Sequence, residues 1–190
     1  MLDVSRPMNI LRTILILGAA FLAVFGEATC PIPRHWLGAQ VDLLPVLMVY
    51  AALTADLATV SLLAVLGGLG FDALSANPLG ISILPLFAVG FVIYLRRDLM
   101  LREVSFAQLV LGTVASAVVP LLTILLLLTA GKQPLLGWGT IWQWLVMTAG
   151  GAAATPFIFA LFDWSNRALG YQPRVEPSFR PDREIRRGRL

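Results

Sequence analysis

The stretch VSFAQLVLGTVASAVVPLLTILLLLTAG, residues 104–131, contains no charged residue, and neither do residues 133–162 that follow Lys132. An apolar run of about 18 or more residues with almost no charge is long enough to cross a bilayer as a helix. A soluble domain of 190 residues cannot bury several such runs, and charges are also only isolated between Thr13 and Leu95. The sequence therefore predicts an all-α integral membrane protein.

The overall composition supports this prediction. Hydrophobic residues make up 58% of the chain and charged residues 13%, whereas about a quarter of the residues in soluble domains are charged. The net charge of +3 hides an asymmetry, because seven arginines fall between residues 167 and 190. Basic residues beside a membrane helix are typical of cytoplasmic anchors, so they do not predict nucleic-acid binding.

Turn signals divide residues 1–169 into a predicted domain of six transmembrane helices. Pro31 and Pro33 end the first helix, and Pro120 predicts a kink in the fifth. Asp56 is expected to cap the third helix by accepting hydrogen bonds from the N–H groups of its first turn. The six predicted helices span about residues 9–28, 37–53, 57–74, 80–95, 106–130 and 141–162.

The distribution of arginine and lysine predicts the orientation. With both termini in the cytoplasm, 12 basic residues lie inside and 2 outside; a five-helix arrangement with an external N-terminus gives 11 and 3. Charge alone barely separates these alternatives, and helix length favours six. We expect both termini to lie in the cytoplasm, with residues 170–190 forming a disordered, basic tail.

Groups that carry out catalysis are sparse in this sequence. The single Cys30 and the single His35 exclude an intrachain disulfide and a metal site built from several histidines or cysteines. No G-x-S-x-G motif occurs. We therefore predict neither an enzyme nor a cofactor or metal site. Glu27, Asp42 and Asp163 fall at predicted helix ends, where water or lipid headgroups are expected to solvate them.

Asp72 is the acidic residue that invites a more specific hypothesis. It lies about one turn before the end of the third predicted helix, after a glycine-rich segment and before the turn formed by residues 77–80. Its carboxylate either holds this turn by accepting backbone N–H groups or faces a partner or ligand. The small residues at 112–116 and 150–154 leave a similar choice, because such faces pack within a bundle or against a partner helix.

The segment GGLGFDALSANPLG, residues 67–80, resembles the segment that marks the rod-shape-determining protein MreD family. In that family a glycine-rich helix ends in an aspartate, followed by a short turn and a Pro-Leu-Gly opening of the next helix. Residues 42–47 are similar to the family's run before its second helix, and the family's usual basic residues are replaced here at positions 54–56. The matching positions are Gly68, Asp72, Pro78 and Gly80.

The resemblance implies a six-helix fold shared with the substrate-binding components of bacterial vitamin-uptake systems. It also implies a non-enzymatic role: binding of the membrane protein MreC, and through it positioning of the cell-wall synthases and the actin-like filament protein. The alternative is a small-molecule uptake component, which requires a closed outer-side pocket with several convergent polar groups. The polar residues available in the outer half are few: Glu27, Arg34, His35, Asp42, Asp72, Asn77, Lys132 and Gln133.

Overall fold

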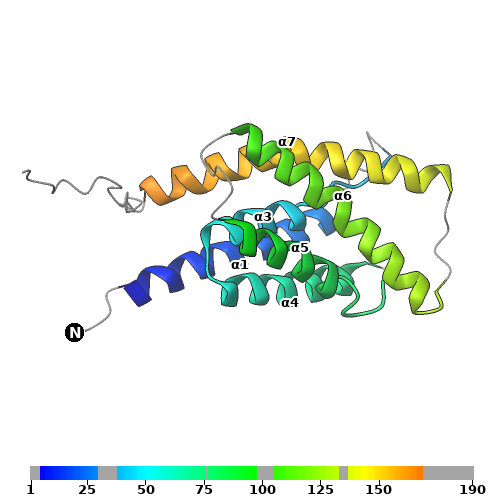
Figure 1. Ribbon diagram of the computed structural model, residues 1–190, viewed down its shortest axis with the longest axis horizontal. Helices are drawn as coiled ribbons and strands as arrows, with labels where there is room; N and C mark the ends of the chain where they lie inside the picture. The colour runs from blue at the N-terminus through cyan, green and yellow to red at the C-terminus, as the bar shows by residue number, and fades with distance from the viewer. Residues whose placement is uncertain (1–4, 30–37, 76, 98–104, 133–136, 169–190) are drawn as a thin grey trace, which may run out of the picture.

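The computed structural model describes residues 5–29, 38–75, 77–97, 105–132 and 137–168, and this part of the chain is all-helical (Figure 1). The predicted tail, residues 170–190, lies outside it. The helices are α1 (Ser5–Thr29), α3 (Leu44–Thr54), α4 (Leu57–Leu74), α5 (Ile83–Arg96), α6 (Ser105–Thr129) and α7 (Trp138–Ala168).

Four of the described helices, α1, α4, α6 and α7, are long and apolar enough to cross a membrane. The chain is therefore a multi-pass membrane protein. By contrast, α3 has 11 residues and α5 has 14. At about 1.5 Å per residue these two helices rise roughly 16 and 21 Å, less than the roughly 30 Å of a hydrocarbon core. Six complete crossings are thus not confirmed.

The short helix α3 forms the centre of the bundle. All of its residues from Leu44 to Leu53 are buried, and it contacts α1, α4, α5, α6 and α7. A helix that is apolar on every side has to be enclosed by protein or by lipid, and here the other helices enclose it. Near its C-terminal end the Tyr50 ring stacks on Phe162, with centroids 4.3 Å apart, and meets Phe159 edge-on at 5.0 Å.

The first described residues of α1 and the last of α7 lie at the same end of the bundle (Figure 1). The C-terminus of α5 reaches this end as well, where Arg97 donates a 3.3 Å hydrogen bond to the carbonyl of Ala55 and covers the ring of Tyr94. Lys132 follows α6 at the opposite end. The other basic residues of the described helices and turns all belong to the first end: Arg6, Arg12, Arg96, Arg97 and Arg167.

Two helices begin later than the sequence predicted. The second predicted helix was to start at residue 37, but α3 starts at Leu44, because Gly38 has a positive φ of 62° and carboxylates bind the N–H groups of Leu43 and Leu44. The fourth was to start at residue 80, but α5 starts at Ile83, since Gly80 has a φ of 91°.

The other predicted bounds agree more closely. Helix α4 covers residues 57–74 as predicted, although Asp56 at its N-cap makes no side-chain hydrogen bond to the first turn, so the predicted cap is wrong. The sixth predicted helix, residues 141–162, is longer in the structure, where α7 covers Trp138–Ala168 and passes through Pro156. A helix of 31 residues extends about 46 Å and therefore projects beyond a hydrocarbon core of about 30 Å.

The helices α6 and α7 pack closely through their small residues. A Cβ atom on Gly112 would collide with the side chain of Thr155, and one on Gly151 would collide with that of Ser116. The small-residue faces at 112–116 and 150–154 thus pack against each other within the chain. This settles the choice that the sequence left open.

Helix α6 also contains Pro120, which has no N–H group to donate to the carbonyl of Ser116. On the neighbouring helix, the indole N–H of Trp144 donates a 3.0 Å hydrogen bond to the carbonyl of Ala117. A polar contact from α7 therefore reinforces α6 close to its proline.

Candidate functional site

Asp72 lies in the last turn of α4 and is only 1% exposed. Its Oδ2 accepts hydrogen bonds from the backbone N–H groups of Gly80, at 2.8 Å, and Ser82, at 3.1 Å. Its Oδ1 accepts the hydroxyl of Ser82 at 2.5 Å. The carboxylate therefore binds N–H groups just before α5, where a negative charge is favoured by the exposed donors of a helix N-terminus. Asp72 holds the α4–α5 turn, one of the two roles that the sequence suggested.

Two glycines of this segment serve the turn in different ways. Gly80 has a φ of 91°, a conformation that side chains with a Cβ rarely adopt. Gly68 lies against the start of α5, where an added Cβ would stand 3.0 Å from the nitrogen of Ile83. Pro78 is exposed, and its carbonyl accepts the N–H of Ile81 at 3.3 Å. The turn thus brings Gly68, Asp72, Pro78 and Gly80 into one structural unit.

This geometry predicts that Gly68→Ala destabilises the protein whereas Gly70→Ala does not. At Gly68 the new methyl group meets backbone atoms of Ile83, which cannot move without shifting α5; at Gly70 its nearest neighbour is a Val24 methyl group at an ordinary 3.8 Å. We expect the free energy of unfolding to fall by about 1–2 kcal/mol for Gly68→Ala, since overpacking costs about 1–3 kcal/mol and helix propensity returns part of it. Thermal unfolding in detergent measures both variants, and equal midpoints would contradict the proposed close approach.

A second polar feature, two acidic side chains, lies at the N-terminal end of α3. Glu27 of α1 accepts the N–H of Leu43 through Oε1 at 2.7 Å, while its Oε2 is buried without a hydrogen-bond partner. Asp42 accepts the N–H of Leu44 through Oδ1 at 2.9 Å and is 6% exposed. The expectation that solvent reaches these acids is therefore wrong for Asp42, because the surrounding helices enclose it. Asp163 is exposed, as predicted.

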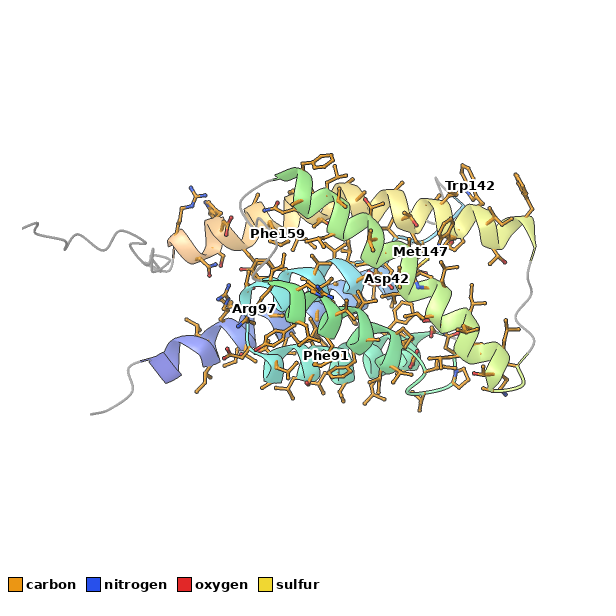
Figure 2. The ribbon with its side chains drawn as sticks, in the orientation of Figure 1. Asp42, Phe91, Arg97, Trp142, Met147 and Phe159 are labelled. Carbon is orange, nitrogen blue, oxygen red and sulfur yellow. The ribbon has the colours of Figure 1, made fainter. Side chains whose placement is uncertain are left out.

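A cavity of about 200 Å³ adjoins Asp42. It lies between the C-terminal half of α6 and the structure formed by the start of α3 and the α4–α5 turn. Asp42 and Met147, which both line it, lie near each other in the middle of the bundle (Figure 2). The polar lining residues are Asp42, Asn77, Ser82 and Thr123, and the apolar ones are Leu44, Phe71, Leu86, Val119, Pro120, Ile124, Leu127 and Met147.

The chain segment that carries Asp42 is fixed to α7. The side chain of Gln143 accepts the backbone N–H of Gln40 at 3.0 Å and donates to the carbonyl of the same residue at 2.8 Å. Next to it, Val41 packs so closely on Gly150 that a Cβ there would lie 2.7 Å from a Val41 methyl group. Contacts on both sides of the segment thus hold Asp42 in place.

Burial raises the pKa of the Asp42 carboxyl group to about 6, and the hydrogen bond from the N–H of Leu44 acts in the opposite direction. The cause is the loss of hydration, which penalises the ionised form. Asp42 thus presents to the cavity an acidic group that water solvates poorly.

Sequence reasoning missed this site, although a signal was present. Glu27 and Asp42 stand on either side of a single interhelical segment in a chain with very few acidic residues elsewhere in its first half. Because both residues lie at the ends of predicted helices, the sequence suggested that water or lipid headgroups solvate them. In the structure, helices enclose Asp42. Among the described residues no group of three or more histidine, cysteine, aspartate or glutamate side chains is arranged to hold a metal ion.

Comparisons with protein-family models, with curated proteins and with solved structures found no match. The resemblance to the MreD family therefore rests on the residues quoted above.

Proposed function

We propose that this protein is a non-enzymatic membrane scaffold of the bacterial rod-elongation machinery. It binds an MreC-like membrane protein and through that partner helps to position the cell-wall synthases and the actin-like filament protein. One observation supports this proposal most: Asp72, in the family-like segment of residues 67–80, binds Gly80 and Ser82 of the chain itself through both of its carboxylate oxygens. An acid engaged in this way stabilises a rigid shape, which is what a scaffold requires.

The proposed location is the bacterial inner membrane, with both termini of the chain in the cytoplasm. In support, the basic residues of the described helices belong to the end that holds the start of α1 and the end of α7, and Lys132 belongs to the other. Cytoplasmic ends of membrane helices are enriched in arginine and lysine.

Photo-cross-linking in membranes tests the scaffold proposal. A cross-linking amino acid is placed at one exposed position on each long helix: Phe21, Leu66, Leu125 and Leu161. We expect an MreC-like protein to be captured from one face of the bundle only, and we expect cells that lack the protein to lose their rod shape. A protein that is purified alone from every variant, together with normal shape after deletion, would reject the proposal.

A further inference from the structure

We propose that the cavity beside Asp42 binds a primary ammonium group carried on a compact apolar body, with the Asp42 carboxylate as its counter-ion. This inference goes beyond the scaffold role and does not depend on it. The site lies between α6, the start of α3 and the α4–α5 turn.

The size and lining of the cavity define the body of the ligand. A cavity of about 150 Å³ lined by apolar side chains is known to hold benzene. The volume here is about 200 Å³, and eight of its twelve lining residues are apolar. A six-membered ring with a one-carbon substituent therefore matches the available space.

The polar groups of the cavity favour a ligand that donates hydrogen bonds. The hydroxyl of Ser82 gives its proton to Asp72, and that of Thr123 gives its proton to the carbonyl of Val119 at 2.9 Å. Both hydroxyls thus have only lone pairs left. The Asp42 carboxylate is also an acceptor, and one of its oxygens is engaged by Leu44. Three of the four polar lining residues can therefore accept a hydrogen bond from a ligand.

The charge balance favours a cationic donor. Asp42 is 6% exposed, and the neighbouring Glu27 is close enough to interact with it electrostatically. A carboxylate in such surroundings loses hydration that a paired ammonium group restores in part. A bound anion would meet the Asp42 carboxylate with repulsion, so the cavity should exclude it.

Three probes of the same shape test this inference on the full chain in detergent: benzylamine, benzyl alcohol and benzoate. We expect benzylamine to raise the thermal unfolding midpoint in a concentration-dependent manner, benzyl alcohol to raise it less, and benzoate to leave it unchanged. Asp42→Asn keeps the shape of the side chain and should weaken benzylamine at least tenfold. Asp163→Asn, the same change at an exposed position, should have no effect.

A second variant keeps the test independent of any folding defect at Asp42. Thr123→Phe places a ring from α6 into the cavity and should abolish the benzylamine shift while the midpoint without ligand is unchanged or higher. The inference is overturned if the three probes shift the midpoint equally, or if Asp42→Asn and Thr123→Phe bind benzylamine like the wild-type protein. No partner protein is present in this assay. A negative result would therefore reject the ammonium site without affecting the scaffold proposal.

The ammonium group has two natural sources, a free amine or the headgroup of phosphatidylethanolamine. Nanodiscs of phosphatidylethanolamine and of phosphatidylcholine, whose quaternary nitrogen has no N–H to donate, distinguish them. If benzylamine binds more weakly in phosphatidylethanolamine nanodiscs than in phosphatidylcholine nanodiscs, the phosphatidylethanolamine headgroup is the occupant. If it binds equally in both, the occupant is a free amine. Both outcomes support an ammonium site.

Discussion

An Asp72→Ala variant is expected to unfold far more readily than the wild-type protein, with a loss of about 3–5 kcal/mol in the free energy of unfolding. The substitution removes three hydrogen bonds to a carboxylate and leaves the N–H groups of Gly80 and Ser82 without an acceptor at the start of α5. Each hydrogen bond to a charged group contributes about 1.5–3 kcal/mol, and an unpaired buried donor is costly in itself. The loss should therefore exceed that of a typical point mutation.

Two further variants distinguish the loss of the Asp72 hydrogen bonds in the turn from a general effect of removing a negative charge. Asp163→Ala removes an acid from the exposed face of α7 and should leave the unfolding midpoint almost unchanged. Ser82→Ala removes one of the three hydrogen bonds and should give an intermediate loss. Thermal and denaturant unfolding in detergent, followed by circular dichroism, measure all three variants. If Asp72→Ala behaved like Asp163→Ala, the turn would not depend on the carboxylate.

The role of Asp72 was one of the two that the sequence suggested, because it depends on local sequence. A glycine-rich helix end, an acid and a short turn lie within fourteen residues, 67–80, and the acceptor and its donors are at most ten positions apart. The bounds of α4 were predictable for the same reason, since a polar break in the apolar run, residues 54–56, precedes it and turn residues follow it.

The environment of Asp42 could not be predicted, because it is created by segments distant in sequence. Gln40, two residues before it, is held by Gln143 on α7, and the cavity next to it is closed in part by α6 and α7. A hydropathy pattern places an acid at the end of an apolar run but does not show how deeply other helices enclose that end.

Hydropathy also predicted that α3 crosses the membrane, which its length does not support. Its composition is as apolar as that of a spanning helix, but its 11 residues are surrounded by five other helices. A helix shielded by protein on all sides does not have to match the bilayer thickness, because its ends meet protein groups such as Glu27 and Asp42 rather than lipid. Apolar composition alone therefore does not distinguish a helix enclosed by protein from one that crosses the bilayer, whereas length does.

The second large effect is expected at the contact between α6 and α7. Gly151→Val should reduce the free energy of unfolding by about 3 kcal/mol or more, because the first added carbon already collides with the side chain of Ser116. The helices would have to separate along the whole face that joins them. Gly18→Val, the same change in the middle of α1, should have a small effect, since a Cβ there has nothing within 4 Å. Thermal unfolding and the monodisperse fraction after extraction measure both.

A reciprocal exchange shows whether the contact itself is responsible. Gly151→Ser alone should destabilise the protein, because its hydroxymethyl group meets that of Ser116. Adding Ser116→Gly removes the opposing side chain, whose hydroxyl is buried without a hydrogen-bond partner, and should cost only about 1 kcal/mol of helix propensity. The double variant should therefore recover most of the stability that the single variant loses. If it recovered none, the two helices would not meet at these positions, and the small residues would instead be free to face a partner helix.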